Sequence, residues 1–250
     1  MKHKKWIVAI LLFFMLVGLG ILVVSLAESW RLEQSLGQSV ASFKEHSQSI
    51  LSTVPDDAKT TETEPILPEL RAAMEEYNKK IYLDGQAELV DSASYEAEIF
   101  DLSQYGIDDE IVGVITIPKI DLEMSLYLGA TSAHLELGFA QLSQTSAPIG
   151  GENTNCVVAG HRGWRNADYF YHADKLEIGD LVFLENYWEV LTYQVVEIKT
   201  VTPDDRESAL IQPGRDLLTL LTCTPYRVNS HRLLVICERV ENSEGGNNND

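Results

Sequence analysis

The pattern of hydrophobic and polar positions divides the chain into a long apolar run, a polar middle and a C-terminal part built from short apolar segments. The apolar run covers 21 uncharged residues, 6–26, and follows Lys2, Lys4 and Lys5. At about 1.5 Å per residue, a helix of this length crosses a hydrocarbon core of about 30 Å. We therefore predict a single-pass membrane anchor over 1–27, with its start in the cytoplasm and the rest of the chain outside the cell. A cleaved signal peptide is the alternative, because Ser-Leu-Ala-Glu-Ser near the end of the run resembles a cleavage site.

The polar middle begins with apolar side chains at three- and four-residue spacing. This spacing, from Leu32 to Phe43, predicts an amphipathic helix over 28–52. Residues 54–69 hold three prolines among acidic residues and threonines, a composition typical of a linker. We assign residues 28–74 to an extracellular stalk.

A second helix is predicted from Glu69 to Leu83, where Asp84 and Gly85 form a stop signal. The acidic, weakly patterned residues that follow are interpreted as a loop or lid. Residues 75–111 are therefore expected to form a helix and a lid-like segment in front of the next domain.

The C-terminal part consists of short β-branched or apolar runs separated by turn signals such as Gly150-Gly151. Seven or eight short strands at this spacing are typical of a closed barrel or a sandwich. We predict a mainly β domain over 112–240, a closed barrel of seven to eight strands. Short helices should connect the strands, one of them at 164–176. The polar tail at 241–250 is expected to be disordered.

The charge of the chain narrows the choice of partners. It carries 38 acidic and 19 basic residues, a formal net charge of −19, and three of the basic residues precede the apolar run. Such an acidic exported part argues against nucleic acid and against anionic lipid headgroups as partners. The scattered histidines show no metal-ligand spacing, so neither a metal nor another cofactor is predicted.

Three cysteines are too few for a disulfide scaffold, and their odd number leaves at least one free or externally paired thiol, which is a candidate nucleophile. Cys156 and Cys237 lie in apolar runs and are interpreted as buried core thiols, with a disulfide between them as the alternative. Cys223 differs, because it ends one predicted strand and Arg232 begins the next. If these strands are antiparallel neighbours, Cys223 and Arg232 share one face, whereas Cys237 points to the other.

This pair suits nucleophilic catalysis, because a guanidinium favours a thiolate and stabilises an oxyanion. The nucleophile also needs a proton-transfer partner. His161 is the candidate, since it lies where a predicted strand runs into a glycine-flanked turn, a place where a scaffold presents a side chain at a rigid edge.

Two stretches resemble a known family. Thr-Leu-Leu-Thr-Cys-Thr-Pro-Tyr-Arg-Val-Asn-Ser-His-Arg-Leu-Leu-Val at 219–235 closely resembles the cysteine and arginine signature of sortases, in the form of the class C, pilin-polymerising group. Val-Val-Ala-Gly-His-Arg-Gly at 157–163 resembles the histidine motif of the same family. The resemblance extends over about residues 75–240 and implies a sortase-like β-barrel in a membrane-anchored cysteine transpeptidase of Gram-positive bacteria.

The resemblance also implies the roles of the candidate residues. Cys223 would attack the Thr–Gly bond of a Leu-Pro-x-Thr-Gly-like sorting signal, His161 would transfer the protons, and Arg232 would bind the oxyanion. A lysine amine of a second pilin would then take over the acyl group. The implied partners are pilin or surface proteins that carry sorting signals, and no cofactor is implied.

The sequence departs from the class C pattern at two places. Asp91 matches the acidic residue of the lid motif, but Ser92 and Ala93 stand where that motif has proline and an aromatic residue. Gln141 stands where relatives carry a histidine. Two further hypotheses therefore stay open: a housekeeping-type sortase that attaches surface proteins to cell-wall precursor, and an inactive domain that binds sorting signals without cutting them.

Overall fold

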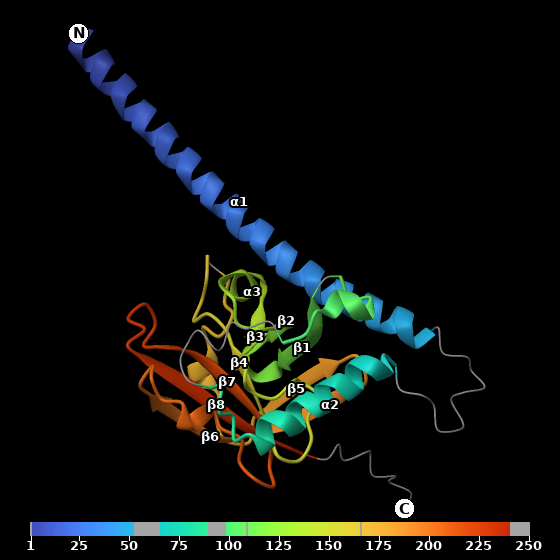
Figure 1. The fold of residues 1–250 in the computed structure, drawn as a ribbon. Coiled ribbons are helices and arrows are strands. Elements are labelled where there is room, and N and C mark those ends of the chain that lie inside the picture. Colours follow the sequence, from blue (N-terminus) through green and yellow to red (C-terminus); the bar gives the residue numbers. More distant parts are fainter. Residues whose placement is uncertain (1, 53–65, 90–98, 109, 166, 241–250) are drawn as a thin grey trace, which may run out of the picture.

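The computed structural model describes the chain in five stretches, residues 2–52, 66–89, 99–108, 110–165 and 167–240. A long N-terminal helix, α1 (Lys2–Ser52), projects from a compact β domain (Figure 1). The large apolar side chains of its first half are exposed from Ile10 to Leu26, and the helix is long and apolar enough to cross a membrane. It is the one candidate for a membrane span among the helices that the structure describes.

The second half of α1 packs against the β domain. Val40, Phe43 and Ser47 recur at three- and four-residue spacing and are buried, which confirms the amphipathic helix predicted over 28–52. The Phe43 ring lies 5.0 Å from the ring of Tyr187 in the domain. This part of the chain is therefore fixed to the domain, while the boundaries predicted between anchor, stalk and catalytic domain stay predictions.

The second predicted helix is confirmed as α2 (Pro68–Leu83). Pro68 stands in its first turn, where a missing backbone N–H costs no helical hydrogen bond. Asn78 on its buried face holds the loop around Ala147, because its amide donates to the Ala147 carbonyl at 3.4 Å and accepts from the Ala147 N–H at 2.7 Å. The helix is thereby clamped to the β domain.

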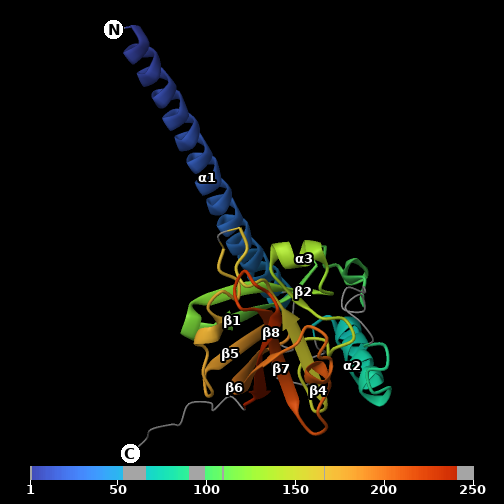
Figure 2. The same cartoon turned by 90° about the vertical axis from the view of Figure 1, so that its left-hand side faces the viewer.

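The β domain is a barrel of eight strands, β1 (Ile111–Ile117), β2 (Leu122–Leu128), β3 (Phe139–Gln141), β4 (Thr154–Ala159), β5 (Leu181–Asn186), β6 (Val190–Val201), β7 (Asp216–Thr224) and β8 (His231–Arg239). They close in the order β1-β2-β3-β4-β7-β8-β6-β5, which confirms the predicted closed barrel (Figure 2). The β2–β3 and β4–β7 pairs are parallel, and the others are antiparallel. The short helical elements are η3 (Leu102–Tyr105), η4 (Pro118–Ile120), α3 (Ser132–Leu137), η5 (Ala173–Lys175) and η6 (Glu207–Ala209).

Side chains of β7 alternate between the two faces of the barrel wall. Leu218 and Leu220 belong to the main core inside the barrel, whereas Leu221 packs on a second, smaller apolar cluster on the outer face. Because successive strand residues point to opposite faces, Cys223 shares the outer face with Leu221. This alternation places Cys223 on the outer face, where a substrate can contact it.

The helix predicted at 164–176 is wrong. A bridge between Trp164 and Ala167 is followed by turns, and only η5 is helical. Arg165 and Tyr169 have φ angles of 46° and 43°, which a right-handed helix does not contain. The described residues of the β4–η5 loop, 160–165 and 167–172, are therefore irregular.

The alternative disulfide is not formed, since all three cysteines are free. Cys156 and Cys237 are both register partners of Leu218, on the two strands that flank β7. Neighbouring strands lie about 4.8 Å apart, so the two flanking strands are about 9–10 Å apart. That separation exceeds the Cα distance of about 4.4–6.8 Å that a disulfide requires.

Candidate active site

Cys223 and Arg232 face each other at one end of the barrel. β7 and β8 pair in antiparallel register, with Cys223 opposite Arg232 and Thr224 opposite His231. Direct partners have Cβ atoms about 4.5–5.5 Å apart and share a face of the sheet. Both side chains are half-buried. The predicted cross-strand pair is confirmed, while its catalytic role stays a prediction.

The β7–β8 loop, residues 225–230, helps to hold the Arg232 guanidinium. Nη1 donates to the Asn229 carbonyl at 3.3 Å and to the His231 carbonyl at 3.1 Å. Both bonds come from one nitrogen, so neither occupies the Nε and Nη2 donors of the fork. The guanidinium can therefore receive an anion while its contacts with the loop stay in place.

His161 reaches the same end of the barrel through β4. This strand pairs with β7 in parallel register, and the pairing continues past its end. The Gly160 N–H donates to the Leu221 carbonyl at 3.1 Å, and the Thr222 hydroxyl donates to the Gly160 carbonyl at 2.8 Å. One further step along each chain leads to His161 and Cys223, so the backbones that carry them run side by side.

Two aromatic rings hold the His161 imidazole. The Trp164 ring is stacked on it, with centroids 4.5 Å apart and planes inclined by 15°. The Tyr169 ring meets it edge-on at 5.9 Å. Burial lowers the pKa of His161 below its ordinary value, and the nearby Glu136 carboxylate acts weakly in the opposite direction. At neutral pH the imidazole of the free protein is therefore mostly uncharged.

Tyr169 connects this ring cluster to α3. Its hydroxyl donates to the Glu136 carbonyl at 2.7 Å. Burial raises the pKa of Tyr169 to about 12, so the hydroxyl keeps its proton and remains a donor. Helix α3, which lies more than twenty residues before His161 in the sequence, therefore supports the ring that contacts the imidazole.

Arg162 ties the loop that carries His161 to η5. Its guanidinium is buried, with Nε donating to the Tyr171 carbonyl at 2.9 Å and Nη2 lying 3.0 Å from the Asp174 carboxylate. Two buried donors of this loop, Nη1 of Arg162 and Nε1 of Trp164, have no hydrogen-bond partner among the residues that the structure describes. The sequence analysis missed both residues, although His-Arg-Gly-Trp contains them directly after the candidate histidine.

An apolar strip lies on the outer face of the barrel next to Cys223. It is formed by Leu89, Ala130, Ala140, Leu142, Val157, Ala159 and Ala209, with Leu135 and Leu221 at its margin. The strip covers β3, β4 and β7 and reaches the residue two positions before Cys223. The sequence analysis missed it, because its members come from six separate segments, and only the alternation within β7 could have indicated it.

Cys156 and Cys237 lie inside the barrel and are almost wholly buried. Burial raises the pKa of both thiols well above the ordinary value. Both therefore stay protonated and unreactive, which confirms their interpretation as core thiols. Cys223 is the one cysteine of the chain that a substrate can reach.

The remaining sequence candidates do not join this cluster. Asp91 lies outside the described residues. Gln141 is fully buried and pairs with Val158, whose side chain belongs to the core inside the barrel. Its amide donates to the carbonyls of Thr145 at 2.8 Å and Ser146 at 3.3 Å, so it braces the loop after β3.

The part of the chain that the structure describes holds no group of three or more His, Cys, Asp or Glu side chains able to bind a metal ion. A cavity of about 370 Å³ lies between η3 and α3, and its lining includes Phe100, Glu110 and His134. None of the three candidate catalytic residues lines it. This cavity and the three candidate catalytic residues therefore occupy different places in the fold.

A thiol beside a guanidinium, with an imidazole on the neighbouring strand end, is the set of groups that a cysteine acyl-transfer enzyme requires. The sortase domain family matches residues 115–240, which is half of the chain. The chain belongs to the sortase family, whose members are cysteine transpeptidases.

Several sortases are similar to this chain in sequence or structure. Sortase C1 of Streptococcus agalactiae is 30% identical, with 84% of this chain and 100% of that chain covered and a TM-score of 0.66. Sortase C of Streptococcus pneumoniae is 35% identical, with 81% and 96% covered and a TM-score of 0.60. Sortase A of Bacillus anthracis is 27% identical over 159 residues, which are 63% of this chain and 74% of that protein.

Proposed function

We propose that this sortase polymerises pilins: it cleaves a Leu-Pro-x-Thr-Gly-like sorting signal and joins the acyl group to a lysine of a second pilin. The observation that supports this most is the direct pairing of Cys223 with Arg232 beside the strand end that leads to His161. The sortase C structures that the chain resembles favour pilins as substrates, since the description of the Streptococcus pneumoniae enzyme concerns pilin substrate specificity.

In the first step, the Cys223 thiolate attacks the carbonyl carbon of the threonine in the signal. Arg232 donates from the unoccupied nitrogens of its fork to the oxyanion that forms. His161, as an imidazolium, gives its proton to the departing glycine amine, and the C–N bond breaks. The threonine remains on Cys223 as a thioester.

In the second step, the lysine amine of another pilin attacks this thioester. His161, now neutral, takes a proton from the attacking amine, and Cys223 leaves as a thiolate. The product is an isopeptide bond, and both protein groups have returned to their initial charge states. The same three side chains therefore suffice for cleavage and ligation.

The burial of His161 limits how much enzyme is ready for the first step. Because its pKa is lowered, the imidazolium is the minor form at neutral pH. The active pair of imidazolium and thiolate is thus confined to a fraction of the molecules. Arg232 lies opposite Cys223, where its permanently charged guanidinium can donate to the oxyanion that forms.

The segment that leads into the predicted lid is attached to the outer face of the barrel. The Gln86 amide donates to the Gln144 carbonyl at 2.9 Å and accepts from the Ile211 N–H at 2.7 Å. Three residues further on, Leu89 packs in the apolar strip. This supports a lid that includes Asp91 and starts beside the strip, on the outer face that Cys223 shares.

The proposed location is the cell membrane, with α1 as a single span. Lys2, Lys4 and Lys5 favour a cytoplasmic N-terminus and a catalytic domain outside the cell. Anchoring suits the reaction, because enzyme and substrates confined to one membrane meet at a high effective concentration.

The acceptor amine tests the proposal. The purified enzyme is given a pilin with a sorting signal together with either a lysine-bearing pilin or a lipid II-like amine, and the covalent products are counted. Predominant pilin ladders are expected. Predominant transfer to the lipid II-like amine would contradict the proposal and favour the housekeeping-type sortase, which the similarity to a sortase A supports.

The inactive-domain hypothesis is tested with a thiol-reactive probe. An activated thiolate labels quickly, whereas the buried thiols of Cys156 and Cys237 should label only on unfolding. Rapid labelling of Cys223 in the native protein is expected. Labelling of Cys223 no faster than a free cysteine would favour a domain that only binds signals.

A further inference from the structure

The direction in which the membrane span leaves the barrel is fixed by the structure. α1 is one unbroken helix from the apolar run to the segment packed on the domain. The Ser39 and Ser125 hydroxyls are 2.9 Å apart, and Lys44 forms an ion pair with Glu123 on the same strand. Only about 20 Å of helix separate Leu26, at the end of the apolar run, from Ser39. The bilayer must therefore lie close to the domain.

The tip of the β4–η5 loop reaches α1 where the helix leaves the apolar run. A groove of about 840 Å³ is lined by Arg165 of this loop and by Ser25, Glu28, Ser29, Arg31, Leu32 and Ser35 of α1. Ser25 belongs to the last residues of the apolar run. The loop that carries His161 thus extends to the level at which the helix would emerge from a membrane.

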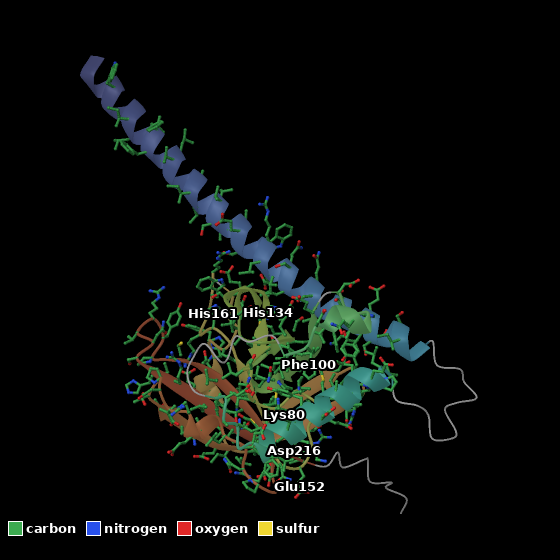
Figure 3. The ribbon with its side chains drawn as sticks, viewed as in Figure 1. Lys80, Phe100, His134, Glu152, His161 and Asp216 are labelled. Atoms are coloured by element: carbon green, nitrogen blue, oxygen red, sulfur yellow. The ribbon has the colours of Figure 1, made fainter. Side chains whose placement is uncertain are left out.

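The β7–β8 loop joins the same surface. Its Tyr226 ring meets the Tyr171 ring of the β4–η5 loop edge-on at 4.9 Å. Both views show these loops on the side of the barrel that faces the N-terminal half of α1 (Figures 1 and 2). His161 lies at this end, whereas Glu152 and Asp216 lie at the opposite end (Figure 3).

The exposed side chains of these loops suit a membrane surface. Val228 is 67% exposed and Tyr226 is 41% exposed at the tip of the β7–β8 loop. Arg165 and Arg227 are exposed and lie over the rings of Trp164 and Tyr226. Aromatic residues with nearby arginines are typical of the zone between hydrocarbon and water.

We propose that the catalytic end of the barrel faces the bilayer, with the β4–η5 and β7–β8 loops against the headgroup layer of the membrane that α1 spans. The contact is imposed by the helix and needs no net attraction, and the exposed Arg165 and Arg227 give this face local positive charge although the overall charge is −19. This inference shares with the proposed function only the assumption that α1 spans the membrane. It implies that sorting signals are received at the bilayer surface, from substrates that are still tethered there.

The test measures how close each end of the barrel lies to lipid headgroups. The full chain, with Cys223→Ala to leave only buried native thiols, is reconstituted into phosphatidylcholine vesicles. A fluorophore is attached at Val228→Cys or at Val190→Cys, and quenching by headgroup-attached spin labels is recorded. Val190 is a matched exposed valine at the start of β6, whose other end pairs with Arg232. Several-fold stronger quenching at position 228 than at position 190 is expected.

Equal quenching at the two positions, or stronger quenching at 190, would overturn the proposal. A third label at Trp30→Cys, just beyond the apolar run, reports insertion itself. Quenching at position 30 without quenching at 228 would overturn the orientation and leave the anchor intact, and no quenching at 30 would overturn the anchor. If position 228 were quenched only after phosphatidylglycerol is added, electrostatic docking would replace the orientation imposed by α1. No catalysis is measured, so an inactive sortase would give the same result.

Discussion

The two ends of the barrel are built from the same strands, yet they use their polar groups differently. At the end where β7 begins, the Asp216 carboxylate accepts from the Tyr193 hydroxyl at 3.0 Å, the Gly151 N–H at 2.8 Å and the Thr154 hydroxyl at 3.3 Å. At the end where β7 finishes, Cys223 is half-buried and Arg232 keeps two donors of its fork out of its loop contacts. The first end uses its carboxylate in internal hydrogen bonds, whereas the second leaves donors of Arg232 outside its loop contacts.

Buried donors without a hydrogen-bond partner among the described residues occur at both ends. They are Nη1 of Arg162 and Nε1 of Trp164 in the β4–η5 loop, and Nη1 of Arg239 at the end where β7 begins. Native proteins satisfy nearly all buried polar groups, so each such donor costs stability. The comparison therefore rests on β7 itself, which begins at an internally bonded carboxylate and ends at the proposed site, where a half-buried thiol faces a guanidinium with two donors outside its loop contacts.

The largest effect should come from the nucleophile. Cys223→Ala should lower transpeptidation by at least about 10³-fold, because no other thiol reaches the outer face. Cys156→Ala is the matched control, and it should leave turnover unchanged while lowering the free energy of unfolding by about 1 kcal/mol through the lost core contacts. Pilin ladders on denaturing gels and urea unfolding measure the two quantities. Wild-type ladders from Cys223→Ala would remove the nucleophile assignment.

The next largest effect should come from the guanidinium. Arg232→Lys should lower kcat by about 10²–10³-fold, because an ammonium cannot reproduce two donors aimed at one oxyanion. Arg215→Lys is the control at the other end, since Arg215 forms a two-pronged ion pair with Glu238 at 2.9 and 2.8 Å. Steady-state cleavage of a signal peptide should be normal in this control. A normal kcat in Arg232→Lys would contradict the oxyanion role.

A smaller effect on activity should follow from removing the ring that is stacked on the His161 imidazole. Trp164→Ala should lower kcat/KM by about tenfold, because His161 loses its stacked ring and its fixed orientation. Burial now holds the pKa of His161 below its ordinary value, so exposing the ring should raise that pKa. The acid limb of the pH–rate profile should therefore move to higher pH. Trp164→Phe, which keeps a stacking ring, should restore the wild-type profile, and an unmoved limb in Trp164→Ala would show that the indole only packs.

The smallest effect on activity should come from the opposite end. Asp216→Ala should leave kcat and the pH profile unchanged, because the carboxylate lies far from the reacting groups along β7. It should lower the free energy of unfolding by about 1–3 kcal/mol, since the Tyr193 hydroxyl and the Gly151 N–H lose their hydrogen-bond acceptor. Thermal unfolding and peptide cleavage check both parts. A loss of activity larger than that of Trp164→Ala would show that the two ends are coupled.

The sequence predicted those features that depend on neighbours along the chain. The apolar period of α1 and α2, the short strands of the barrel and the facing of Cys223 and Arg232 across one loop all follow from local periodicity. The segment at 164–176 was misassigned, because its composition permits a helix while the positive φ angles of Arg165 and Tyr169 exclude one. Those angles arise where the loop closes around His161.

The sequence by itself therefore determined the barrel, the long apolar helix and the pairing of Cys223 with Arg232, since two strands joined by a short loop have few ways to pair. Only the tertiary structure decided that His161 arrives beside Cys223, because the parallel β4–β7 pairing joins segments about sixty residues apart, as the bond between Thr222 and Gly160 shows. It also decided that Trp164 stacks on the imidazole and that Arg165 of the same loop lies across a groove from residues Ser25 to Ser35 of α1. Contacts between distant segments depend on how whole strands close into a barrel, and the local spacing of apolar residues does not predict that closure.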